Sequence, residues 1–132
     1  MSLDERHDLI IKATSDFLKR AGYIVTLGAS IGDRERKKYV DILATSPAVA
    51  LLVEVKGFET GSSDVLAMKS NLHSAMHTPS LEGKSIEAII ISPGTVDPAK
   101  DLSKELGVKV VEIHSAKEVE RNLGQLIQKS SS

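Results

Sequence analysis

Three charged residues stand inside two apolar segments of this sequence, where a charge is costly. Asp41 lies in Tyr-Val-Asp-Ile-Leu-Ala, and Glu54 and Lys56 lie in Leu-Leu-Val-Glu-Val-Lys-Gly. Residues two apart in a strand point to the same face, so Glu54 and Lys56 share one face of their strand. These two acids and one amine are the first candidates for chemistry.

The two segments, residues 39–45 and 49–56, predict an antiparallel hairpin because they are rich in β-branched residues and flank a proline turn. If Ser46 faces Val49 across that turn, Asp41 lies directly opposite Glu54. Two facing carboxylates destabilise a sheet, and partial burial adds a desolvation cost. A divalent cation between them removes both penalties, because Mg²⁺ prefers carboxylate and carbonyl oxygens.

A plainer interpretation of the same residues stays open. Asp41 could end its strand in solvent, and Glu54 with Lys56 could form an ion pair on an exposed face. The spacing of all three charges between apolar runs favours the metal site, with Lys56 pointing at whatever the metal binds.

Length and composition predict one cytoplasmic α/β domain over residues 1–132, with a frayed tail at 130–132. Seventeen basic and eighteen acidic side chains leave a net charge of -1, which excludes a strongly basic coat. The absence of cysteine excludes disulfides, zinc–thiolate sites and a cysteine nucleophile. No apolar run approaches the roughly 20 residues that span a bilayer, so no membrane partner is expected.

Hydrophobic periodicity predicts four helices and five strands, with the strands joined into one mixed sheet. Helices are expected at 4–21, 64–77, 97–106 and from 115 onward, and strands at 23–27, 39–45, 49–56, 86–92 and 108–113. Residues 28–38 are expected to form a polar loop. The parallel part of the sheet comes from the last two strands, which are joined through a helix.

Asp41, twelve intervening residues and then Glu54-Val55-Lys56 resemble the PD-(D/E)xK motif of restriction-endonuclease-like nucleases. Those proteins carry the motif on a hairpin of a mixed sheet that follows a helix, as predicted here. The segment Gly22-Tyr23-Ile24-Val25 and the stretch 92–111 are also similar to Mrr-like and archaeal junction-resolving members. The resemblance implies a restriction-endonuclease-like three-layer core.

The resemblance also implies an activity, that of a metal-dependent DNA endonuclease of restriction or junction-repair type. Asp41, Glu54 and the Val55 carbonyl would then hold Mg²⁺, for which Mn²⁺ substitutes. Lys56 would orient the attacking water or stabilise the charge that develops on the phosphate.

Six further side chains are candidates for DNA contact. They are Arg34, Arg36, Lys37 and Lys38 in the polar loop, and Lys69 and His73 on the following helix. The loop could bind phosphates, a contact that is independent of sequence and sensitive to salt. Acidic neighbours in the same loop leave open a merely solvated turn, and the helix residues could form an ordinary polar face.

The first helix has no acid at residues 10–12, where many relatives of this kind carry a glutamate. His7 shares a helical stripe with Ile10 and Thr14, so it could approach the site or be an ordinary helix-end residue. The missing acid favours an alternative function, a catalytically inactive nuclease-fold subunit that serves DNA binding or an assembly. A short chain offers little surface for gripping a duplex, so a homodimer is a further expectation.

Overall fold

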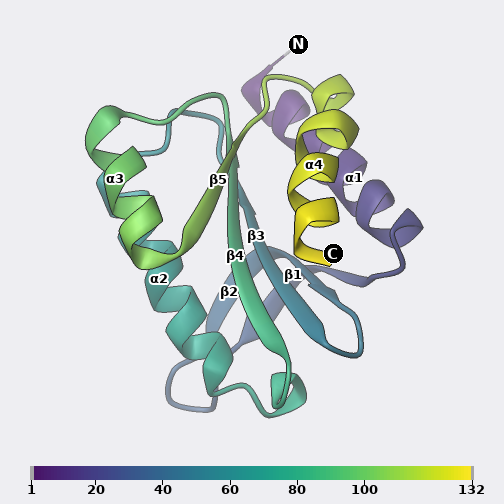
Figure 1. The fold of residues 1–132 in the computed structure, drawn as a ribbon, viewed down its shortest axis with the longest axis vertical. Helices are drawn as coiled ribbons and strands as arrows, with labels where there is room; N and C mark the ends of the chain where they lie inside the picture. The colour runs from purple at the N-terminus through teal and green to yellow at the C-terminus, as the bar shows by residue number, and fades with distance from the viewer. Residues whose placement is uncertain (1, 132) are drawn as a thin grey trace.

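A mixed five-stranded sheet with helices on both faces forms the framework of the protein (Figure 1). The computed structural model describes residues 2–131. The helices are α1 (Leu3–Arg20), α2 (Ser62–Met76), α3 (Asp97–Leu106) and α4 (Val119–Ser131). The strands are β1 (Ile24–Ile31), β2 (Lys38–Thr45), β3 (Val49–Val55), β4 (Ser85–Ser92) and β5 (Val108–Glu112). Short 3₁₀ turns occupy Pro79–Leu81 and Ala116–Glu118.

The strands lie in the spatial order β1-β2-β3-β4-β5. β1, β2 and β3 pair antiparallel, whereas β3, β4 and β5 pair parallel. The carboxyl ends of β3 and β4 therefore meet at one edge of the sheet. This arrangement confirms the α/β class, the mixed sheet and the order of elements that the sequence predicts.

Each face of the sheet has its own apolar core, one beneath α1 and α4 and one beneath α2 and α3 (Figure 1). Strand β3 supplies both cores: Leu51 and Val53 belong to the first, and Leu52 belongs to the second. A strand that is covered on both faces needs a nearly continuous apolar sequence, which is what β3 and β4 show. A charge on β3 is consequently tolerated only at its end, where Glu54 lies.

Strand β1 is longer than the sequence indicates, because it continues to Ile31 instead of ending at residue 27. The buried Ile31 packs in the core beneath α2. The hairpin of β1 and β2 bends near Gly28, whose φ of +57° favours glycine. Across the bend, Ile42 packs in one core and Val40 in the other, although they are only two residues apart. Asp41 is not among the paired residues of β1 and β2, and its backbone N–H bonds to a side chain, Glu54 Oε1.

The helix ends also differ slightly from those expected. α2 begins at Ser62, where the Asp64 carboxylate accepts a hydrogen bond from the Gly61 N–H (2.9 Å). α4 extends to Ser131, and the frayed tail expected at 130–132 stays a prediction, with residue 132 outside the described part. None of the described helices is long and apolar enough to cross a membrane.

Candidate active site

Asp41 and Glu54 face each other at the open end of the β2–β3 hairpin. Ile42 pairs with Val53, and extending this register by one residue places Asp41 opposite Glu54. The turn predicted from the proline is present, since Ser46 N–H donates to the Val49 carbonyl (2.8 Å). The hairpin register that the sequence predicts is therefore confirmed.

The two carboxylates accept hydrogen bonds from backbone N–H groups of the opposite strand, at a position where backbone carbonyls would usually accept them. Asp41 N–H donates to Glu54 Oε1 (3.2 Å), and Val55 N–H donates to Asp41 Oδ2 (2.8 Å). Both acidic side chains are half-buried. Each acid thus holds the backbone of the opposite strand, which fixes the two carboxylates side by side.

Burial, and secondly the neighbouring Asp41 carboxylate, raise the pKa of Glu54 from 4.5 to about 7. Lys56 acts in the opposite direction but more weakly. A Glu54 carboxyl that holds a proton near neutral pH can exchange it for a cation, because either one relieves the repulsion from Asp41.

The donor atoms around this pair are chemically suited to a hard divalent cation. Two carboxylates and the Val55 carbonyl at the strand end are all oxygen donors, which Mg²⁺ and Mn²⁺ accept. Among the residues that the structure describes, no three His, Asp or Glu side chains converge closely enough to hold a metal by themselves. A backbone oxygen and water would therefore have to complete the set.

The raised pKa predicts how the stability of the metal-free protein depends on pH. The unfolded Glu54 ionises near pH 4.5 and the folded one near pH 7, so the free energy of unfolding should fall as pH rises through this window. Glu54→Gln mimics the neutral acid and should remove that fall. Denaturant titrations in EDTA at pH 5 and pH 8 measure the difference.

The exposed Glu82 provides a matched control, since Glu82→Gln should leave the pH dependence of the wild type unchanged. A Glu54→Gln variant whose stability follows the wild type over the whole range would contradict the burial of a neutral Glu54.

Lys56 directly follows β3, and its N–H donates to the Ile91 carbonyl (2.7 Å). Its ammonium lies 4.0 Å from Asp64 Oδ1, and Asp64 Oδ2 caps the start of α2. Sequence reasoning missed Asp64. Its only signal is the Gly61-x-x-Asp spacing typical of a helix start, which does not reveal a lysine partner.

His7 approaches the same strand end from the first turns of α1. Its Nε2 lies 2.8 Å from the Val55 carbonyl oxygen. A small hollow next to this contact is lined in part by Lys56, Gly57 and His114. Of the two interpretations that the sequence left open for His7, the structure supports the approach to the site.

The basic loop between β1 and β2 forms a hydrogen-bonded turn whose side chains contact α2. Asp33 Oδ1 accepts hydrogen bonds from the N–H groups of Glu35 and Arg36, and these bonds lower the pKa of Asp33. The Arg36 guanidinium lies 3.4 Å from His73 Nε2, and Lys38 Nζ donates to Ser70 Oγ. The loop is therefore held at one place on the surface.

Lys69 and His73 lie away from the carboxylates. Both line a hollow with Ile86, at the start of β4, whereas the carboxylates lie near the end of the parallel strand β3. Lys69 Nζ donates to the Leu106 carbonyl at the end of α3 (3.3 Å). The structure does not bring either side chain beside the site, and their contact with DNA stays a prediction. The α2 residue near Lys56 is instead Asp64.

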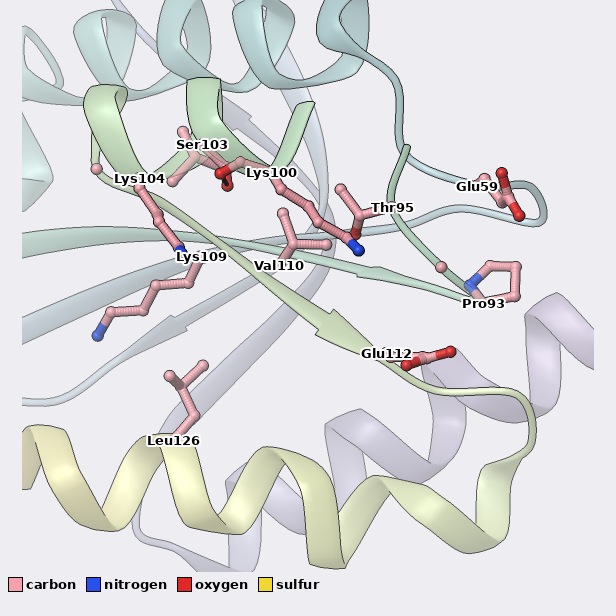
Figure 2. A pocket seen from close by; sticks show the side chains of 13 residues that line it. Glu59, Pro93, Thr95, Lys100, Ser103, Lys104, Lys109, Val110, Glu112 and Leu126 are labelled. Carbon is pink, nitrogen blue, oxygen red and sulfur yellow. Dashed lines mark hydrogen bonds between the residues drawn. The ribbon is translucent and has the colours of Figure 1, made fainter. Parts of the chain in front are cut away.

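A much larger hollow lies elsewhere, between α3 and the edge strand β5 (Figure 2). It has a volume of about 830 Å³, and Lys100, Lys104 and Glu112 are among its lining residues. Neither Asp41 nor Glu54 lines it. This groove has the larger volume, but its described lining residues carry charges of both signs and include no pair of facing acids. The candidate active site is therefore placed at the strand ends that carry Asp41 and Glu54.

The framework is a mixed sheet between two helix pairs, with two acids and a lysine near the open end of the central hairpin. No protein-family model and no curated protein matches the chain. Solved structures do match. A repair endonuclease from Pyrococcus abyssi has a TM-score of 0.64 at 19% identity and covers 87% of this chain. EndoMS bound to double-stranded DNA has a TM-score of 0.62 at 17% identity and covers 82%.

A third match, a protein of unknown function called AF1548, has a TM-score of 0.56 at 14% identity and covers 77% of this chain. The chain spans 48%, 42% and 56% of the lengths of these three proteins, respectively. The likeness shows the fold, and it confirms the nuclease-like α/β architecture that the sequence predicts.

Proposed function

We propose that the protein is a metal-dependent DNA endonuclease with a PD-(D/E)xK-type site. The observation that supports the proposal is the hydrogen bond from Asp41 N–H to Glu54 Oε1 across the strands, with Lys56 two residues further along the chain. Two facing, half-buried carboxylates repel each other when both are ionised, and a bound cation would relieve that repulsion. The fold shared with two endonucleases supports the same interpretation.

Asp41, Glu54 and the Val55 carbonyl would hold Mg²⁺ or Mn²⁺. Such a cation, when bound, neutralises phosphate charge and lowers the pKa of a coordinated water. Lys56 acts next to it: its ammonium orients the attacking water or stabilises the developing phosphorane charge. Asp64 Oδ1 lies 4.0 Å from that ammonium.

DNA is the proposed substrate. One of the matched structures is a complex with double-stranded DNA, and that protein shares the fold of this chain. The ordered basic loop provides the phosphate contacts, and a homodimer would present two sites to two strands. The matched repair endonuclease favours a substrate of junction or repair type over a fixed recognition sequence.

A catalytically inactive nuclease-fold subunit is the second candidate. The observation that favours it is the contact between His7 and the Val55 carbonyl, which in the described structure engages one of the proposed metal ligands. In that case DNA or a partner protein would bind without being cut.

Cleavage of a DNA panel separates the two candidates. Linear duplex, single strand, flap and four-way junction are each incubated with Mg²⁺, Mn²⁺ or EDTA, and the melting temperature is measured with the same additions. An endonuclease cuts at least one substrate only with metal, and it is stabilised by metal because the folded state alone binds it. No cleavage and no thermal shift with either metal would favour the inactive subunit.

The basic loop predicts a specific salt dependence of DNA binding. Replacing Arg34, Arg36, Lys37 and Lys38 by glutamine should weaken binding to all sequences and flatten the plot of log K against log salt by about 0.9 for each phosphate that is no longer neutralised. Fluorescence anisotropy in EDTA measures the slope. The control replaces the same number of basic residues on α1 and α4, namely Lys12, Lys19, Arg20 and Arg121. An unchanged slope in the loop variant would make the loop a solvated turn.

A further inference from the structure

The aromatic side chains of the chain divide into two packed rings and two exposed ones. The sequence has two phenylalanines, two tyrosines and no tryptophan, and all four rings lie in the part of the chain that the structure describes. Phe17 and Tyr23 pack against the core beneath α1 and α4. Tyr39 is 62% exposed and Phe58 is 73% exposed.

Both exposed rings are close in sequence to the candidate active-site residues. Tyr39 precedes Asp41 by two residues on β2, and Phe58 follows Lys56 by two residues after the end of β3. Single exposed apolar residues are common on soluble proteins. Neither ring belongs to a core of the sheet, however, so packing does not account for two rings at the strand ends that carry the acids.

The loop that carries Phe58 is held at both of its ends. Before it, Lys56 N–H donates to a β4 carbonyl (2.7 Å). After it, the N–H of the buried Thr60 donates to the Gly94 carbonyl just beyond β4 (2.8 Å). Residues 57–59 therefore form a short connection between two fixed points. A ring presented in this way loses little conformational entropy when a ligand binds to it.

Each exposed ring also has a lysine close to it. Lys37 Nζ lies 5.7 Å from the centroid of the Tyr39 ring, and Lys56 precedes Phe58 by two residues. Proteins that bind single-stranded nucleic acid combine basic groups for the phosphates with aromatic rings on which bases stack. A base inside an intact duplex already has neighbours on both faces, so a protein ring can stack only on a base that is unpaired or displaced.

We propose that Tyr39 and Phe58 stack on unpaired bases next to the cleaved phosphodiester, so that the protein prefers DNA with single-stranded nucleotides to a fully paired duplex. The inference rests on the proposed function, because the cleaved bond is the one held at the paired acids. It specifies the substrate class: a flap or a gap offers free base faces beside a phosphate, and an intact duplex does not.

Fluorescence anisotropy of the full chain in EDTA measures this preference without cleavage. The wild type should bind a duplex with a single-stranded flap at least about tenfold more tightly than an intact duplex of the same length. The double variant Tyr39→Ala with Phe58→Ala should lose most of that preference and keep its affinity for the intact duplex. Its melting temperature should stay near that of the wild type, because neither ring packs in a core.

Ile24→Ala is the matched control. It removes a similarly exposed apolar side chain, 74% exposed, that pairs with Thr45 at the other end of β2. This variant should keep the wild-type preference for the flap. Phe58→Leu and Phe58→Trp separate stacking from apolar contact: leucine has no ring face and should behave like alanine, whereas tryptophan should retain the preference.

A flap with abasic nucleotides next to the duplex tests the same contact from the DNA side. It keeps the phosphates and removes the base faces, so it should bind the wild type as weakly as the normal flap binds the double variant. Removing the bases should have little further effect on the double variant, as in a double-mutant cycle of two groups in contact.

Two results would overturn the stacking role: a double variant that prefers the flap as strongly as the wild type, or a wild type that does not distinguish the flap from the duplex. Neither result affects the proposed function, which metal-dependent cleavage of the DNA panel decides separately. Conversely, a ring-dependent preference for the flap in a protein that cuts no DNA would overturn the endonuclease and retain the stacking site.

Discussion

Asp41→Asn is expected to reduce metal-dependent cleavage below detection while leaving the protein folded. The amide replaces one of the two carboxylates proposed to bind the metal, but its oxygen can still accept the hydrogen bond from Val55 N–H. The negative charge that raises the pKa of Glu54 is also removed. The metal-free variant should therefore melt at the same temperature as the wild type or higher, and the thermal shift with Mn²⁺ should disappear.

Asp101→Asn, on the exposed face of α3, is the matched control and should keep full activity. Cleavage assays and thermal melts with and without Mn²⁺ provide both readouts. An Asp41→Asn protein that unfolds would show that the acids are structural partners. One that folds and still cuts DNA at the wild-type rate would contradict the proposed metal site.

The hairpin could be predicted in detail because two local signals agree on it. The proline turn sets which residues pair, and alternation along β3 then sets which of its side chains share a face. A register error of one residue would have moved Asp41 away from Glu54. The observed pairing of Ile42 with Val53 matches the prediction, so the central part of the candidate site follows from sequence alone.

The extension of β1 to Ile31 could not be predicted, because the residues in and after this segment have the composition of a loop. Gly28 and the charged residues after Ile31 are typical of a loop. The strand forms because Ile31 gains burial beneath α2, and because Gly28 accepts a positive φ at the bend. Both causes are tertiary, and neither leaves a periodic pattern.

The contact of Asp64 was not predicted, and that of His7 was left as one of two alternatives, for a different reason. Asp64 meets Lys56 only because the chain leaves β3 and returns as α2 at the same sheet edge. His7 meets Val55 across 48 positions of sequence. Periodicity places a residue on a face of its own element, but it does not say which strand end that face will reach.

Lys56→Ala is expected to lower the single-turnover cleavage rate at least about a hundredfold, the scale for losing one preorganised charge at a reacting centre. The affinity for Mn²⁺ should stay the same or rise slightly, since a like charge near the cation is removed. DNA binding should fall only modestly, because the other phosphate-binding side chains are unchanged. Single-turnover kinetics, isothermal titration and anisotropy measure the three quantities.

An ordinary ion pair between Lys56 and Asp64 predicts a different result. The two groups lie 4.0 Å apart, and the lysine side chain is 39% exposed. Losing such a pair costs under about 1 kcal/mol of stability and should leave the rate unchanged. Lys100→Ala removes the comparable pair with Asp97, at 3.5 Å on the surface of α3, and serves as the control.

Lys56→Arg adds a second discriminator. It retains the positive charge and can still pair with Asp64, but a planar guanidinium cannot take the point position of an ammonium. If Lys56 acts on the attacking water or the phosphorane, the arginine variant should remain well below the wild-type rate. Wild-type rates in both variants, on a DNA that the parent protein cuts, would remove Lys56 from the mechanism, because a charge that acts at the reacting atoms cannot be deleted without slowing the reaction.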